Sequence, residues 1–213
     1  MKFQLVTQTQ RVGMQLEAIP DQILDGQPKV DRLMFDAILE SVSPDHIAVS
    51  SAIAFGDFVA HDLSFASPIS RQAAEAIQEY LATRRVSVGE LTDAPRKQWP
   101  TEGRLEILPS SKSIKLESFS FNGDSAHRLY LVDGAAFSGA LGSPLQSIVA
   151  SNYRVFSRAN SVHPTKVLVT HGVLFSRDLH VRLLAAPLDG LDEHDAQRIA
   201  DLVRAVDLNI RFY

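Results

Sequence analysis

The chain has 213 residues, of which 45% are apolar and 22% charged, so it is long enough to bury a core and too apolar for a disordered protein. Its 21 basic and 25 acidic side chains give a net charge of −4, which excludes a uniformly basic nucleic-acid binder. The absence of cysteine excludes a disulfide scaffold, a thiolate zinc site and a cysteine nucleophile. The sequence holds no apolar run near the roughly 18 residues that span a bilayer and no apolar signal segment at its start, so we expect a cytoplasmic protein with no membrane partner.

Apolar residues in the first half alternate in some segments and recur at helical spacing in others. Alternation predicts strands, and helical spacing predicts amphipathic helices. In chain order the predicted elements are strands at 2–9 and 12–16, a helix at 30–42, strands at 47–53 and 59–65, a helix at 70–83 and a strand at 85–88. This βαββαβ order is that of a ferredoxin-like unit.

The second half predicts the same order of elements after a proline-containing segment at 92–104. In chain order we expect a strand pair within 105–121, a strand at 129–132, a short helix at 143–149, strands at 166–170 and 179–183, a helix at 196–203 capped by Asp192, and a strand at 208–212. The predicted fold class is therefore α+β, with tandem ferredoxin-like (βαββαβ) units and antiparallel sheets. The predicted organisation is a first unit at 1–92, a linker and strand pair at 93–127, and a second unit at 128–213.

Three segments carry a resemblance to a known family. They are Val132-Asp133-Gly134-Ala135-Ala136-Phe137-Ser138-Gly139-Ala140-Leu141, Val169-Thr170-His171-Gly172-Val173-Leu174-Phe175, and Val30-Asp31-Arg32-Leu33-Met34-Phe35-Asp36-Ala37-Ile38-Leu39. With the predicted tandem topology, they resemble the RAMP superfamily, the RNA-binding subunits of CRISPR systems. The resemblance implies guide RNA and the other protein subunits of a ribonucleoprotein complex as partners.

The expected RNA site lies in the segment 109–182, which holds eight basic and four acidic side chains and is net positive although the chain is acidic. Alternation over 153–158 suggests a strand with charge, ring and charge on one side, and such a face binds phosphates and stacks bases. A glycine, which has no side chain, lets the backbone approach a phosphate closely. The predicted phosphate ligands are Arg154, Arg158, Lys166 and Arg177, the predicted stacking platform is Tyr153 or Phe156, and the predicted close-approach glycines are Gly134 and Gly139.

Catalysis is not expected. RAMP nucleases commonly place a histidine in or beside the first helix, and the helix predicted at 30–42 has none, with His46 as the nearest. The resemblance therefore implies a non-catalytic subunit, and no cofactor or metal is expected. Two alternatives stay open: a protein–protein assembly subunit without RNA contact, which the acidic first half suits, and a small metal-independent endoribonuclease or hydrolase.

The hydrolase alternative depends on the region from His171 to His180. Ser176 with Asp178 and His180 could form a triad, and His171, Asp178 and His180 could hold a metal. The sequence fixes neither an oxyanion hole nor a third strong metal ligand, so neither site is part of the expected function.

Overall fold

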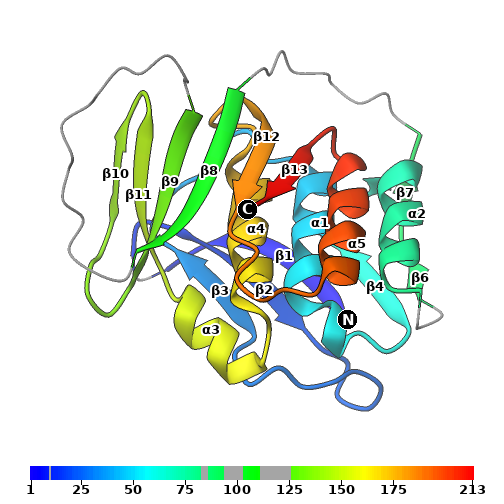
Figure 1. The fold of residues 1–213 in the computed structure, drawn as a ribbon. Coiled ribbons are helices and arrows are strands. Elements are labelled where there is room, and N and C mark those ends of the chain that lie inside the picture. Colours follow the sequence, from blue (N-terminus) through cyan, green and yellow to red (C-terminus); the bar gives the residue numbers. More distant parts are fainter. Residues whose placement is uncertain (10, 83–85, 94–102, 111–125) are drawn as a thin grey trace.

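The structure, a computed structural model, describes residues 1–9, 11–82, 86–93, 103–110 and 126–213 (Figure 1). The helices are α1 (Pro44–Phe55), η1 (Gly56–Phe58, a 3-10 turn), α2 (Arg71–Tyr80), α3 (Tyr153–Asn160), α4 (Pro164–Phe175) and α5 (Glu193–Arg204). The strands of the first half are β1 (Lys2–Thr7), β2 (Met14–Ile19), β3 (Arg32–Phe35), β4 (Asp62–Phe65), β5 (Ile69–Ser70), β6 (Ser87–Val88) and β7 (Leu91–Thr92). The strands of the second half are β8 (Gly103–Ser110), β9 (Ala126–Asp133), β10 (Ala140–Ser143), β11 (Gln146–Ser151), β12 (Val181–Ala186) and β13 (Asn209–Phe212).

Strands from both halves form one mixed sheet. The strand order of this sheet is β13-β12-β8-β9-β11-β3-β2-β1-β4-β6, and β10 pairs with β11. The strands β5 and β7 form a separate, parallel two-stranded sheet. The halves meet where Ser151 of β11 pairs antiparallel with Phe35 of β3. The predicted mixture of helices and strands is confirmed, but the tandem ferredoxin-like units are not. The sheet is also not purely antiparallel, because all the pairings within one group of strands are parallel. That group is β13, β12, β8, β9 and β11.

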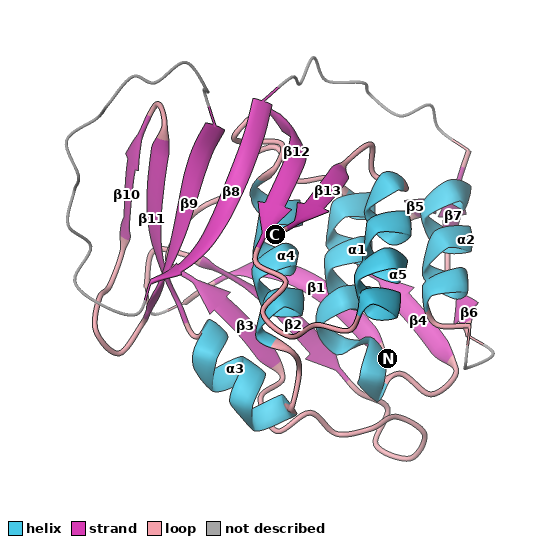
Figure 2. Ribbon diagram, viewed as in Figure 1, coloured by secondary structure: helices cyan, strands magenta, loops and turns pink. Residues whose placement is uncertain are grey.

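The two halves share one repeated pattern of parallel strands and helices. In the first half β1, β4 and β6 are parallel neighbours, with α1 and α2 between them in the chain. In the second half β8, β12 and β13 are parallel neighbours, with α4 and α5 in the same places. Figure 2 shows the sheet curving around these helices. The two halves thus repeat an arrangement of three parallel strands and two helices, which is not the ferredoxin-like repeat that the order of elements predicted.

The centre of the molecule is the contact between α1 and α4. Both helices are buried on all sides, because α1 also packs on β1 and β2 and α4 also packs on β8 and β12. The approach is close, since Ser50 Oγ donates to the Thr170 carbonyl at 3.4 Å and both residues are wholly buried. A helix without a polar face has a short continuous apolar run, which in sequence looks like a buried strand. The predicted strands at 47–53 and 166–170 are therefore wrong.

Three further predicted elements are corrected. The predicted helix at 30–42 is instead the strand β3 followed by irregular chain, with Leu33 and Phe35 buried and Arg32 and Met34 exposed. The predicted helix at 143–149 is the hairpin of β10 and β11, in which Ser143 pairs with Gln146. The predicted strand at 153–158 is α3, because its buried residues follow helical spacing rather than alternation. The buried residues of α3 are Tyr153, Phe156, Ser157 and Asn160.

Elements with a clear polar face or a capping residue are confirmed. The helix α2 begins after Ser70, whose side chain accepts from the Ala73 amide, and α5 begins after Asp192, whose side chain accepts from the His194 amide. The predicted strands at 2–9, 12–16, 59–65, 129–132, 179–183 and 208–212 correspond to β1, β2, β4, β9, β12 and β13. Of the predicted strand pair within 105–121, the structure describes β8, and residues 111–125 lie outside the described residues. Among the described residues, none of the helices combines the length and the apolar composition that a membrane span requires.

We predict that Gly172→Ala destabilises the fold although alanine favours helices. A Cβ on Gly172 would overlap Ile107 Cδ1, and Ile107 is wholly buried in β8. The expected loss is about 1–3 kcal/mol of unfolding free energy, measured by urea denaturation. Ile107→Val removes the overlapping methyl, so the double variant should lose less than the two single losses together. Simple additivity in this cycle would contradict close packing of α4 on β8.

Candidate functional site

The predicted site residues do not form one site. Tyr153, Arg154, Phe156 and Arg158 lie on α3, and Gly134 and Gly139 lie in the loop between β9 and β10. Lys166 lies in the first turn of α4, whereas Arg177 lies beyond its other end, about 16 Å away at 1.5 Å per residue. The structure brings the α3 residues and the glycines to one edge of the sheet and places Lys166 away from them, in a pocket among the helix ends.

That edge is formed by the carboxyl ends of three parallel strands. The strands β8, β9 and β11 end at Ser110, Asp133 and Ser151, and Asp133 pairs with Ser151 in register. The loop after β9 folds back over the edge, since the Gly134 amide donates to the Ser151 carbonyl at 2.9 Å. Ligands of α/β proteins commonly bind outside the carboxyl ends of parallel strands.

Gly139 closes this loop. Its φ of 100° is a conformation that side chains other than glycine rarely adopt, and its amide donates to Asp36 Oδ2 at 2.8 Å. The amide is therefore already bonded and not available to a phosphate. The predicted role of Gly139 as a phosphate contact is replaced by a structural one: it ties the loop to the chain after β3.

Arg154 is held at the same edge. Its Nε donates to the Tyr153 hydroxyl at 2.8 Å, and one terminal nitrogen donates to the Ser110 carbonyl at 3.2 Å. Arg158 follows one helical turn later, is exposed, and makes no hydrogen bond or ion pair with any described residue. The two guanidinium groups therefore share the outer face of α3.

The predicted stacking platform is wrong. Tyr153 and Phe156 are only 3% and 0% exposed. The Phe156 ring packs edge-on against Phe55 of α1, with centroids 5.1 Å apart. Neither ring face can receive a base while α3 keeps this position, so the α3 surface offers charge without aromatic stacking.

Two asparagines that sequence reasoning missed hold α3 in place. The Asn152 side chain accepts from the Met34 amide and donates to the Arg32 carbonyl, both at 2.9 Å. The Asn160 side chain accepts from the Val30 amide at 2.9 Å and donates to its carbonyl at 2.7 Å. These bonds join segments about 120–130 residues apart, and no sequence signal marks such partners. They also bring Lys29, exposed beside Val30, to the end of α3.

His46 does lie in the first helix, contrary to the sequence prediction. It is the third residue of α1, it is 4% exposed, and its Nδ1 lies 2.7 Å from Ser43 Oγ. The prediction that the first helix has no histidine is therefore wrong, because the first helix is α1. Catalysis by His46 is disfavoured because its ring is buried.

Ser151 and His171 form a buried polar pair. His171 Nδ1 lies 2.8 Å from the Val167 carbonyl and so carries the proton, which leaves Nε2 to accept from Ser151 Oγ at 2.9 Å. Burial lowers the pKa of His171 to about 4, and Ser151 is itself 3% exposed. A serine and a neutral histidine at this distance resemble a nucleophile and its base. However, no carboxylate holds Nδ1 and the site is closed to substrate, so the pair joins β11 to α4.

The other hydrolase and metal candidates are not assembled. Ser176 is wholly buried and donates to the Val173 carbonyl at 2.8 Å, and His171 is enclosed within α4. Asp178 Oδ1 accepts from the amides of Glu40 and Ser41 at 3.3 and 3.0 Å. The part of the chain that the structure describes holds no group of three or more histidine or carboxylate side chains suited to a metal ion.

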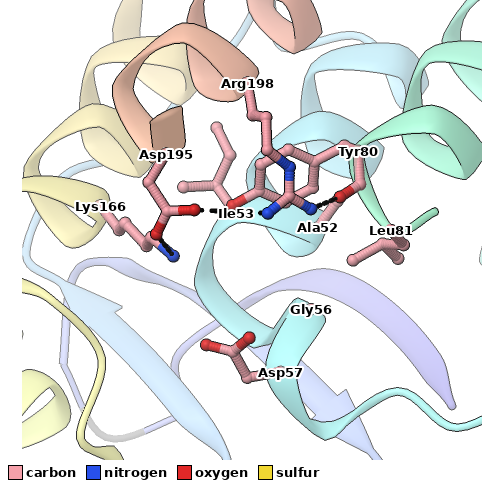
Figure 3. Close-up of a pocket in the computed structure, with 9 residues that line it drawn as sticks. All are labelled: Ala52, Ile53, Gly56, Asp57, Tyr80, Leu81, Lys166, Asp195 and Arg198. Carbon is pink, nitrogen blue, oxygen red and sulfur yellow. Dashed lines mark hydrogen bonds and ion pairs between the residues drawn. The ribbon is translucent and has the colours of Figure 1, made fainter. Parts of the chain in front are cut away.

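Lys166 lines a pocket of about 240 Å³ where the ends of four helices meet (Figure 3). Its Nζ lies 2.8 Å from Asp195 Oδ2, and Arg198 approaches Asp195 Oδ1 at 3.3 Å. Arg198 also donates to the carbonyl of Tyr80, and its guanidinium lies 5.0 Å from the Tyr80 ring centroid. Asp57 stands apart on the exposed side of the pocket.

Asp195 binds both cations of this pocket. Burial acts to raise the pKa of Asp195, but the hydrogen bond and charge of Lys166 and the charge of Arg198 outweigh it and lower that pKa below its usual range. One ionised carboxylate is therefore shared between two cations. Lys166 is bonded and 12% exposed, so it is a poor ligand for an external polyanion.

Comparison of the chain with models of protein families, with curated proteins and with solved structures finds no match. Function is therefore inferred from the α3 surface, the buried pair and the pocket themselves.

We predict that the fold loses stability between pH 6.5 and about 4 because of His171. Its pKa in the folded protein is lower than the usual 6.5, so the unfolded chain binds the proton more readily in this window. The stabilising contribution is complete above pH 6.5 and falls away as the pH approaches 4, by about 3 kcal/mol. Urea denaturation across this range measures it.

His171→Gln should reduce that pH dependence to the part due to His127, whose pKa burial also lowers, whereas His194→Gln, at an exposed position of α5, should leave it as in the parent. An equal slope in the parent and in the His171 variant would contradict a neutral, buried His171.

Proposed function

We propose that the protein is a non-catalytic RNA-binding subunit that contacts the phosphate backbone through the outer face of α3. One observation carries the proposal: Arg154 is held at the carboxyl edge of β8, β9 and β11, with the exposed Arg158 one turn away on the same helix. A guanidinium already oriented by two hydrogen bonds loses little entropy on meeting a phosphate and has further donors to offer it. Guide RNA and neighbouring protein subunits are the partners that the sequence resemblance implies.

Recognition in this proposal depends on charge rather than on bases. With the rings of Tyr153 and Phe156 buried, α3 presents guanidinium groups and the exposed Val155. Phosphate contacts carry no sequence information and are strongly salt-dependent. Two ferredoxin-like units are not part of the proposal, because strands of both halves lie in one mixed sheet.

One acidic group reduces the positive charge of this surface. The Asp133 carboxylate is close enough to Arg154 to interact with its charge, and its Oδ1 accepts from the Ala135 amide at 3.0 Å. Asp133→Asn keeps an oxygen for that amide and removes the negative charge. If the edge binds phosphate, this substitution should strengthen binding, the opposite of losing an arginine.

We predict that Arg154→Ala with Arg158→Ala weakens binding of labelled single-stranded RNA about equally for unrelated sequences. Two lost phosphate contacts reduce the slope of log K against log salt by about 1.4. This corresponds to about 25-fold weaker binding near 0.1 M salt if the curves meet near 1 M. Fluorescence anisotropy over a salt series measures both quantities, with circular dichroism to verify the fold.

The matched control is Arg182→Ala with Arg211→Ala, which removes the same charge from exposed positions on β12 and β13. Weakening by the control as large as that by the α3 pair would reject the α3 surface as the RNA site. An absence of RNA binding by the parent would reject the proposal and favour the assembly subunit without RNA contact.

We also predict that bound RNA is recovered intact. Cleavage by attack of the RNA's own 2′-hydroxyl needs an accessible general base, and His46 is 4% exposed with Nδ1 beside Ser43 Oγ. Incubation with labelled RNA followed by denaturing electrophoresis tests this. Cleavage that His46→Gln abolishes would instead identify the protein as a metal-independent endoribonuclease.

A further inference from the structure

The pocket at the helix ends is lined by a tyrosine whose hydroxyl has no partner among the described residues. Tyr80, the last residue of α2, is 7% exposed and lines the pocket, and its hydroxyl makes no hydrogen bond with any described residue. The hydroxyl is therefore free to bond to a ligand. The stacked guanidinium of Arg198 fixes the ring, so the hydroxyl has a defined position inside the pocket (Figure 3).

The walls of the pocket differ in charge. On one side Lys166 and Arg198 share the single carboxylate of Asp195, which leaves that wall with one excess positive charge and with unused donors on both cations. On the other side Asp57 of η1 is exposed and forms no ion pair with any described residue. A cationic wall faces an anionic rim.

The floor between these walls consists of the apolar residues Ala52, Ile53 and Leu81, which are nearly fully buried. A Cβ on Gly56 would lie 2.8 Å from Leu81 Cδ2, so a larger residue there would force Leu81 to move. The volume of about 240 Å³ corresponds to about eight water molecules at 30 Å³ each, the size of a small metabolite rather than of a nucleotide or peptide.

We propose that this pocket binds a free α-amino acid or a zwitterion of that size. Its carboxylate meets Lys166 and Arg198 and accepts from the Tyr80 hydroxyl, its ammonium group meets Asp57, and its side chain lies on the apolar floor. Burial first, and then repulsion from Asp195 and Asp57, raises the pKa of Tyr80, so the hydroxyl stays protonated and able to donate. This site is separate from α3 and does not depend on RNA binding.

The chemistry of the site predicts which ligands bind. Calorimetric titration of the purified protein with the protein amino acids identifies the tightest binder. The same amino acid without its carboxylate, as the decarboxylated amine, should bind at least about tenfold more weakly because it leaves Lys166 and Arg198 unused. The same amino acid without its ammonium group, as the deaminated acid, should weaken similarly because it leaves Asp57 unused.

Variants test the named groups without removing the fold. Tyr80→Phe keeps the ring under Arg198 and should weaken amino-acid binding about tenfold, whereas Tyr130→Phe on β9 serves as the control and should not. Asp57→Asn should weaken binding of the amino acid but not of its deaminated acid. Arg154→Ala with Arg158→Ala should bind the amino acid as the parent does, so failure of the RNA proposal leaves this result unchanged.

Three results would overturn the proposal. They are the absence of binding by every amino acid tested, binding that Tyr80→Phe and Asp57→Asn leave unchanged, and equal binding of the amino acid and its deaminated acid. The last result would identify a site for simple anions, in which Asp57 has no role.

Discussion

The burial of α1 against α4 is the constraint on which the other features of this structure depend. Two helices can lie in contact and also be covered by sheet only if small or short side chains line their contact. Ser50 and Thr170 are wholly buried there, and Gly172 lets α4 approach β8. The sheet must then curve around the pair, with β1 and β2 against α1 and with β8 and β12 against α4. The parallel triplets in the two halves place both helices in equivalent positions.

Because this centre is filled, polar chemistry is confined to its margins. Where a polar pair does lie inside, as with Ser151 and His171, each group is satisfied and the histidine is neutral. The two margins that collect functional groups are the carboxyl edge of β8, β9 and β11 and the region where the helix ends meet. Each lies at the end of packed elements, so the side chains there are positioned by the core and not by loops alone.

Pairing and burial decide which cations can meet the phosphates of an RNA. Lys166 and Arg158 carry the same charge in sequence, yet Lys166 is bonded to Asp195 inside a pocket while Arg158 stands exposed on α3. Arg154 is intermediate, since its guanidinium is oriented by the Tyr153 hydroxyl and the Ser110 carbonyl and still has donors to spare. The local charge of a segment therefore indicates where phosphate attraction could arise but not which side chains would supply it.

The sequence by itself determined the elements whose pattern is local. The polar faces and caps of α2 and α5 and the alternation of β1, β2 and β13 are visible over a few residues, because one side of each element meets solvent. Only the tertiary structure decided that 44–55 and 164–175 are helices, since an element buried on all sides has no periodic polar face to reveal its type. It also decided that Arg154 and Arg158 share a surface without the rings of Tyr153 and Phe156, which the core takes up. The pocket at the helix ends joins Asp57, Tyr80, Lys166 and Asp195 from four separate helical segments. No local pattern can predict such a meeting, because it is set by how the two halves pack around α1 and α4.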